Sequence, residues 1–406
     1  MGKAIQFSKK SRISKNIGKF YLSAFSGNLS FATGILIFHY RELGFSFLQI
    51  FTISIVYELL NFFLEIPTGV LADLWSCKKT ITLGYFISGA SFFIVLINPE
   101  VFPIYIIWSV LSAVCTTLNS GSVTAFIYDT MQEIDPQKYP TVLGKINAIS
   151  LVTQAVSIIA GGLISERIGF KAVLLLSGIG GLLQSLVIAT TIEPQKTKTF
   201  QNNLKRVPRQ FQEKIISSFR ILFYKPGVRF LLLYGILVFI LSQFVQVIYQ
   251  PYFSGLGYET KSQIGFISAG SLILMAISSI FVGKMKFKKK GLSLLLFLSA
   301  CLCLPLLALR IPNFGIPAFT IFYLTIGAIG VVLSDILNRQ IPSESRATIL
   351  SAQNQLGSIS YSIAAVAFGA GIDQLGIGDS AMITGLISIV LFLLLFSLNK
   401  KKYVWE

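Results

Sequence analysis

Two glutamates lie inside a long apolar run and offer the clearest chemistry in the sequence. Glu58 falls near the middle of the run at 47–71, and Glu65 follows seven residues later, on the same face of a helix. No Lys or Arg occurs in that run. An ionisable side chain is costly among apolar residues, which favour the neutral, protonated carboxyl. Such a carboxyl could take up and release a proton in step with another event.

Uncharged polar side chains recur along the other apolar runs and could line a binding site. Amides donate and accept hydrogen bonds, so they suit a neutral, zwitterionic or amphipathic solute. No Lys or Arg lies in the middle of a run, which argues against a multiply anionic solute. The same amides could instead hold neighbouring helices together. The candidate binding residues are Asn28, Asn119, Asn147, Gln154, Gln243, Gln246, Gln250, Asn354 and Tyr361.

The residue types needed for catalysis or metal binding are scarce. His39 is the single histidine and is interpreted as an interfacial side chain beside Arg41 and Glu42. The four cysteines lack zinc-ligand spacing, and there is no phosphate-binding loop or nucleophile–histidine arrangement. We therefore expect no metal, no cofactor and no enzymatic activity.

The apolar runs that must position these side chains are long enough to cross a bilayer. Hydrophobic residues make up 53% of the 406 residues and charged residues 13%, against about 25% charged in soluble domains. A transmembrane helix needs roughly 20 apolar residues, whereas barrel strands alternate over about 10. The sequence predicts an all-α membrane protein with about twelve spans. The expected spans are 18–38, 47–71, 80–97, 103–129, 141–165, 170–190, 228–250, 263–283, 292–309, 314–336, 347–370 and 380–398.

Basic residues gather on one side of this topology. The net charge is +17, and 29 of the 34 Lys and Arg residues fall in the cytoplasm when the N-terminus is placed there. Such asymmetry is typical of membrane proteins. No basic patch is interleaved with aromatic residues, so nucleic acid is not expected as a partner. We expect a multi-pass protein of a bacterial inner (plasma) membrane with both termini in the cytoplasm.

A polar stretch divides the predicted spans six and six. The expected domains are an N-terminal six-helix bundle at 1–190, a cytoplasmic central loop at 191–225 and a C-terminal six-helix bundle at 226–406. Two patterns recur at nearly one offset: Asp335 follows Asp129 by 206 residues, and Asp373 follows Glu166 by 207. This echo indicates two pseudo-symmetric bundles with a binding site at their interface.

The segment between the second and third predicted spans carries Gly, Asp and basic residues at a defined spacing. Gly69, Asp73 and Lys78 match the pattern Gly-x-x-x-Asp-Arg-x-Gly-Arg-Lys/Arg. Three positions depart from it: Leu74, Ser76 and Cys77. In this pattern and in its span organisation the chain resembles bacterial twelve-helix transporters of the major facilitator superfamily (MFS). The resemblance implies a loop that locks the cytoplasmic side of two bundles, and the departures predict a weaker lock.

Further charged residues close to the cytoplasmic ends of the spans are candidates for gating. Asp129 and Asp335 end two repeat-equivalent helices, and we expect them to pair with loop cations such as Arg339. Plain juxtamembrane charge is the alternative interpretation. The candidate gating residues are Gly69, Asp73, Lys78, Lys79, Asp129, Asp335 and Arg339.

A glycine pattern of drug antiporters is only partly present in the span at 141–165. Gly144, Gly161 and Gly162 match it, while Thr153, Ser157 and Ile158 stand where two glycines and a proline belong. The resemblance implies a monomeric secondary transporter of a small organic solute that works by alternating access. Protons are the expected coupling ion, and export is the favoured direction. Import of a metabolite or metal chelate, or a receptor that binds without translocating, are the alternatives.

Overall fold

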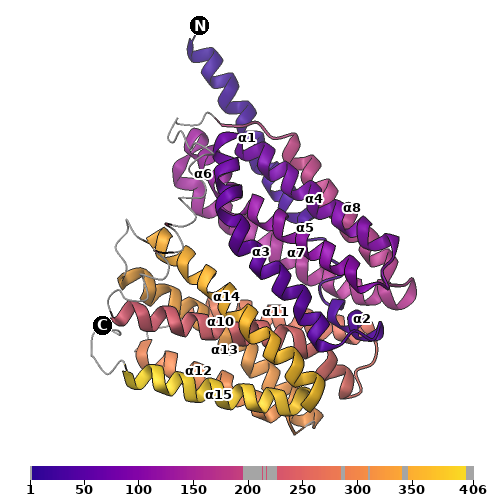
Figure 1. The fold of residues 1–406 in the computed structure, drawn as a ribbon. Coiled ribbons are helices and arrows are strands. Elements are labelled where there is room, and N and C mark those ends of the chain that lie inside the picture. Colours follow the sequence, from indigo (N-terminus) through magenta and orange to yellow (C-terminus); the bar gives the residue numbers. More distant parts are fainter. Residues whose placement is uncertain are drawn as a thin grey trace. The chain divides into compact units, whose positions relative to one another are not determined.

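The computed structural model describes residues 2–194, 213, 216, 226–284, 289–309, 311–340 and 346–398. Every regular element in this part of the chain is a helix, as Figure 1 shows. Ten of the helices are long and apolar enough to cross a membrane. The prediction of an all-α membrane protein is confirmed. The predicted number of about twelve spans is approximate.

The helices fall into two compact units, Met1–Leu36 with Val56–Gln210, and Ile37–Ile55 with Phe211–Glu406. Residues 37–55 lie early in the sequence, but their contacts assign them to the second unit, together with the C-terminal half of the chain. One helix, α3 (Phe47–Leu74), begins in the second unit and continues into the first.

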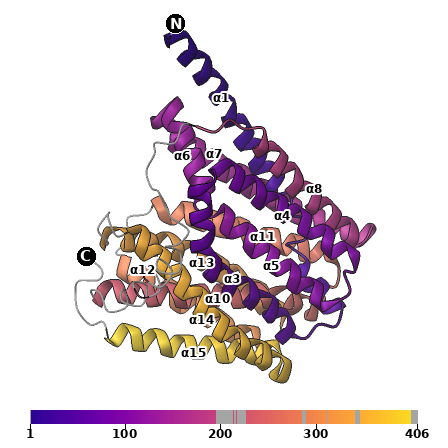
Figure 2. The ribbon, with the colours of Figure 1, turned by 45° about the horizontal axis from the view of Figure 1, so that its top comes forward.

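The first unit contains most of the N-terminal helices. Its helices α4 and α8 run side by side, as both Figure 1 and Figure 2 show. The contact is close because glycines face each other: a Cβ on Gly89 would lie 2.5 Å from the Leu182 nitrogen, and one on Gly181 would lie 2.7 Å from the Gly89 Cα. Besides the later part of α3, the elements are α1 (Gly2–Gly27), α4 (Cys77–Ile97), α5 (Phe102–Asn119), α6 (Ser122–Ile134), the 3-10 turn η1 (Pro136–Lys138), α7 (Tyr139–Arg167) and α8 (Phe170–Ala189).

The second unit contains the C-terminal helices together with α2 and the first turns of α3. Its core is aromatic around Tyr234, whose ring lies 5.3 Å from that of Phe297 and 5.5 Å from that of Phe392. Its elements are α2 (Leu36–Glu42), α10 (Pro226–Gly255), α11 (Lys261–Lys284), α12 (Lys289–Leu307), α13 (Pro312–Gln340), α14 (Arg346–Leu375) and α15 (Ile377–Leu398).

Two predicted spans are interrupted, which corrects the expected helices at 18–38 and 103–129. The first stops at Gly27, passes through turns and resumes as α2 at Leu36. Here side chains bond locally: the Asn28 amide donates to the Ala24 carbonyl at 2.7 Å, and Ser30 bonds to Thr33. Such bonds compete with continued helix. The other span breaks between α5 and α6, where Gly121 takes a φ of 72°.

Glycines on neighbouring helices allow the interrupted segment to pack closely. A Cβ on Gly161 of α7 would overlap the carbonyl oxygen of Phe31, and one on Gly180 of α8 would lie 2.9 Å from the Ser26 oxygen. The glycines kept from the drug-antiporter pattern therefore differ in role, because Gly144 has open space around its Cα. Close backbone approach is the structural reason for a glycine at 161.

These two glycines of α7 give a matched test. We expect Gly161→Ala to lower the melting temperature by about 3 °C or more, because the added methyl collides with a backbone oxygen that cannot move aside alone. Gly144→Ala should leave it unchanged or raise it, since alanine favours a helix by about 0.5–1 kcal/mol over glycine. Thermal unfolding of the purified proteins measures both, and equal melting temperatures would contradict the packing argument.

Candidate functional site

The two predicted proton-carrying glutamates lie on α3 in different surroundings. Glu58 is buried, with 7% of its surface exposed, whereas Glu65 is half-buried. Side chains near both residues tie α3 to α5: Tyr57 and Thr116 share a hydrogen bond of 3.0 Å, and the Thr68 hydroxyl donates to the Thr117 carbonyl at 3.1 Å. Glu58 is thus a buried side chain inside a candidate span, on a helix that is bonded to α5.

A cavity of about 180 Å³ lies within the first unit and is lined by residues from α1, α4, α6, α7 and α8 and by Asn28 at the interruption. Its polar side chains are Ser23, Asn28, Ser150 and Gln184, and Tyr85 adds a phenol. Phe20 and Phe126 meet edge to face in its wall, with centroids 5.5 Å apart. Among the described residues that line the cavity there is no Lys, Arg, Asp or Glu. Of the predicted binding residues, the structure brings Asn28 alone to this cavity.

Gln184 was missed by the sequence analysis, although it is the amide that joins Asn28 in the cavity. Its side chain packs onto Gly27, where any Cβ would overlap the Gln184 amide. A lone amide in the apolar run at 170–190 was the available signal. The glycine that ends α1 therefore also admits Gln184 beside Asn28.

The other predicted binding residues of the first unit lie at separate places. The Asn119 amide donates to the Cys115 sulfur at 3.3 Å and packs against Gly84, where a Cβ would lie 2.8 Å from it. Its Oδ1 is buried, and no partner for it occurs among the described residues. Asn147 is exposed and Gln154 half-buried on α7.

In the second unit, Gln250 holds protein groups together rather than facing open space. It is 1% exposed; its Oε1 accepts from the Phe38 nitrogen at 2.8 Å, and its Nε2 donates to the Tyr249 hydroxyl at 2.9 Å. Tyr361 is equally buried, with its ring 6.1 Å from that of Phe239. The remaining predicted amides are more accessible: Gln243 is half-buried, and Gln246 and Asn354 are exposed.

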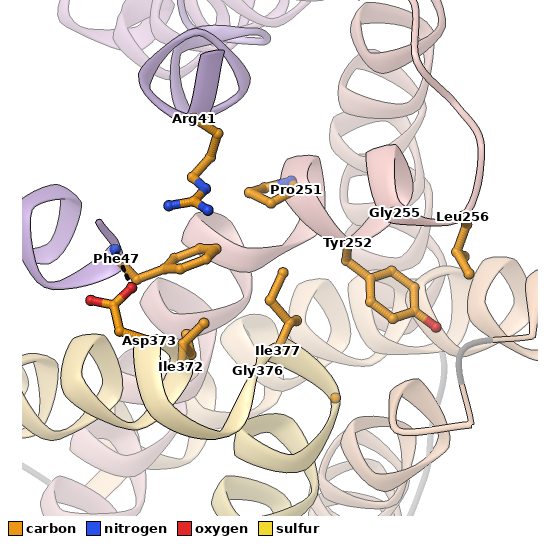
Figure 3. Close-up of a pocket in the computed structure, with 11 residues that line it drawn as sticks. Arg41, Phe47, Pro251, Tyr252, Gly255, Leu256, Ile372, Asp373, Gly376 and Ile377 are labelled. Carbon is orange, nitrogen blue, oxygen red and sulfur yellow. Dashed lines mark hydrogen bonds between the residues drawn. The ribbon is translucent and has the colours of Figure 1, made fainter. Parts of the chain in front are cut away.

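A second cavity, of about 350 Å³, lies in the second unit between the start of α3 and the helices α10, α14 and α15 (Figure 3). Arg41 reaches from α2 onto the ring of Phe47, with its guanidinium carbon 4.5 Å from the centroid. Asp373 of α14 lies beside Phe47 in Figure 3 and accepts hydrogen bonds from the start of α3. The sequence analysis identified Asp373 as the repeat equivalent of Glu166 and gave it no functional role.

His39 lies near this end of the second unit, in α2 and outside the candidate spans. Burial lowers its pKa to about 4, although the neighbouring Glu42 carboxylate, 3.5 Å away, opposes the shift. The imidazole is therefore neutral at pH 7. This agrees with the interpretation of His39 as an interfacial side chain.

The predicted gating residues are only partly brought together. Gly69 is exposed on α3, Lys78 is half-buried and Lys79 is exposed at the start of α4. The side chain of Asp73 lies outside the described part of the structure. Ser76, a departure from the family pattern, has its own function: its Oγ accepts from the Lys79 nitrogen at 3.1 Å and donates to Glu193 at 2.7 Å. A serine here caps α4.

The other pair of predicted gating carboxylates also differs in its surroundings. Asp335 forms an ion pair with Arg339 at 3.0 Å, as expected, four residues along the same helix α13. Both partners are well exposed, so the pair contributes little stability. Asp129 is half-buried on α6. Among the described residues no group of three or more His, Cys, Asp or Glu side chains could hold a metal ion.

Known proteins similar to this chain share its length and fold. An uncharacterized MFS-type transporter of Bacillus subtilis (strain 168), YxaM, is 27% identical over 86% of each chain. A crystal structure of a POT family transporter in complex with a thioalcohol-conjugated peptide is 14% identical, covers 95% of this chain and 97% of that one, and has a TM-score of 0.75. The nucleoside transporter NupG is also 14% identical, over 97% and 99% of the two chains, with a TM-score of 0.70.

These structural likenesses show a shared fold and no shared substrate. The family assignment comes from the sequence itself, which matches the Major Facilitator Superfamily over residues 20–365, most of the chain. Together with the apolar helices and a fold shared with solved transporters, this match shows that the chain belongs to the Major Facilitator Superfamily and is a transporter of that type.

Proposed function

We propose that this transporter couples the movement of a small organic solute to protons, with export as the direction. The observation that carries the proposal is the burial of Glu58 inside a candidate span of α3. A carboxyl in such a place is costly when charged and is by default part of an ion or substrate path. Glu65, which is half-buried and lies seven residues further along α3, is a secondary candidate for the proton-carrying group.

The cavity beside Asn28 supports a solute that is neutral, zwitterionic or amphipathic. Its amides and hydroxyls can both donate and accept hydrogen bonds, and its described lining residues include no charged side chain. Aromatic rings in its wall would cover the flat or apolar part of a solute. A multiply anionic solute would leave its charges without a cation there, so we exclude that class from the proposal.

Uptake of a polar metabolite is the second candidate, and the amide-lined cavity favours it as much as export. The nucleoside transporter and the peptide-bound POT family structure show that this fold accommodates polar solutes in other proteins. Export rests on analogy with the family alone, because the glycine pattern of drug antiporters is kept only in part. Uptake of a metal chelate and solute binding without translocation are weaker alternatives.

The remaining features of the proposal concern the cell. We place the protein in a bacterial inner membrane, with both termini in the cytoplasm, because basic residues gather on that side of the predicted topology. We further propose that it acts as a monomer. The gating roles of Gly69, Asp73, Lys78, Lys79, Asp129, Asp335 and Arg339 belong to the same proposal.

Proton coupling is tested in proteoliposomes that enclose a pH-sensitive dye. A panel of drugs, amino acids, nucleosides and chelates is added to the wild type, and we expect one class to change the internal pH. Glu58→Gln removes the exchangeable proton at nearly constant volume and should abolish that change. Glu100→Gln, in an exposed loop position, serves as the control and should leave it intact. Undiminished proton flux in Glu58→Gln would refute the assigned role.

Solute binding is tested separately from proton flux. A bound solute should raise the melting temperature of the wild type, because it binds the folded state alone. In Gln184→Leu we expect that rise to fall to less than half, since a buried amide partner is lost. Gln137→Leu, at an exposed residue of η1, should behave as the wild type. If Gln184→Leu kept the full rise, the solute would bind elsewhere.

A further inference from the structure

The cavity of about 350 Å³ in the second unit has the size and the lining of a small-molecule site. Ligand pockets usually enclose about 300–1,000 Å³ and combine apolar walls with a few polar groups. None of the described residues that line it also lines the cavity beside Asn28. Two of them are charged, Arg41 of α2 and Asp373 of α14 (Figure 3).

Arg41 is positioned by protein contacts that leave most of its donors available. One guanidinium nitrogen donates to the carbonyl of Phe45, and the guanidinium carbon lies 4.5 Å from the centroid of the Phe47 ring. A guanidinium has five N–H donors in a planar fork that matches a carboxylate. No carboxylate among the described residues forms an ion pair with Arg41. Its remaining donors can therefore bind the carboxylate of a ligand.

The start of α15 adds positive potential to the same cavity. Ile377 and Gly378, the first two residues of this helix, line it. The first amides of a helix have no partner within the helix and attract anions. Asp379 belongs to the same turn and is not among the described lining residues. Arg41 and the start of α15 therefore both favour a negatively charged group in the cavity.

Asp373 supplies the opposite charge. Its two oxygens accept hydrogen bonds from the backbone nitrogens of Phe47 at 2.8 Å and Leu48 at 2.9 Å. A carboxylate offers about four acceptor positions, so about two are left for another donor. In the described part of the chain no Lys or Arg forms an ion pair with Asp373, Arg41 included. Two unlike charges that share a cavity without pairing complement a ligand that carries both charges.

The other described lining residues are mostly apolar. Leu256, Ile372 and Ile377 contribute aliphatic side chains, and Phe47 and Tyr252 contribute rings. Transfer of an apolar group from water to such walls is favourable. The lining therefore suits a zwitterion with a large apolar group better than a small polar one.

We propose that this cavity binds amino acids that have a large apolar or aromatic side chain. Arg41 and the start of α15 bind the carboxylate, Asp373 binds the ammonium group, and the apolar lining covers the side chain. With both termini in the cytoplasm, as proposed above, the cavity lies at the outer end of the second unit. The site is separate from the cavity beside Asn28, and it does not depend on proton coupling through Glu58.

Titration calorimetry of the full chain in nanodiscs tests the class of ligand with three related compounds. Phenylalanine carries both charges, phenylalaninamide lacks the carboxylate and N-acetylphenylalanine lacks the ammonium group; at about pH 6 the α-amino groups are protonated. We expect phenylalanine to bind at least about tenfold more tightly than either derivative, because each derivative loses a charge-assisted hydrogen bond. No binding of phenylalanine, or equal affinity for the three compounds, would overturn the proposal.

Two substitutions assign the two charges to their residues. In Asp373→Asn the advantage of phenylalanine over N-acetylphenylalanine should disappear while its advantage over phenylalaninamide stays. Arg41→Gln should show the reverse pattern, and a merely misfolded variant would not lose one advantage alone. Asp379→Asn and Arg167→Gln remove exposed charges elsewhere and should behave as the wild type. If both advantages survived in Arg41→Gln and in Asp373→Asn, these residues would not bind the ligand.

Gln184→Leu separates this site from the cavity of the first unit. Gln184 lines the cavity beside Asn28, so phenylalanine should bind this variant as tightly as the wild type. Loss of phenylalanine binding in Gln184→Leu, with full binding in Arg41→Gln and Asp373→Asn, would place the ligand in the cavity of the first unit and exclude the proposed site.

Discussion

Backbone amides and carbonyls in a hydrocarbon layer must find hydrogen-bonding partners within the protein, and this requirement governs the architecture. Uninterrupted helices such as α4 and α8 meet it internally. The interruption between α1 and α2 meets it by other means: the Asn28 amide turns back to the Ala24 carbonyl, and the Ile35 nitrogen donates to Ala32 at 3.1 Å. Close approach by Gly161 then encloses the exposed turns in protein.

The same interruption creates the candidate binding cavity. Because α1 stops at Gly27, the Asn28 side chain reaches the cavity wall instead of continuing around a helix. The missing Cβ of Gly27 also leaves room for the Gln184 amide. The break in the helix thus brings the amides of Asn28 and Gln184 to one cavity. Discontinuous helices form solute sites in transporters in the same way.

The parts of this structure that the sequence predicts are those with a signal in one stretch of chain. Long apolar runs predict the spans, and a carboxylate in the middle of one predicts the burial of Glu58. The break after Gly27 was missed because Leu29, Phe31 and Ile35 continue the apolar run through it, although Gly27, Asn28 and Ser30 are residue types that commonly end a helix. The proton-coupling role of Glu58 is still a prediction.

Sites built from distant residues were harder to foresee, because hydropathy carries no information about partners. Gln184 is one amide in an apolar helix, and its significance depends on Gly27. The repeat drew attention to Asp373 without indicating that Phe47 and Leu48 are its partners. Gln250 has helical spacing with Gln243 and Gln246, yet its amide is engaged by the backbone of α2. Periodicity groups residues by face and does not separate solute contacts from structural ones.

The helix α3 carries both the backbone amides bound by Asp373 and the buried Glu58. Its first turn is held by Asp373, and Glu58 lies about three turns further along. Pro67, the one proline inside α3, lies beyond both glutamates, so the stretch from Phe47 to Glu58 is an unbroken helix. The hydrogen bonds to Asp373 and the buried carboxyl of Glu58 therefore belong to one continuous helical element.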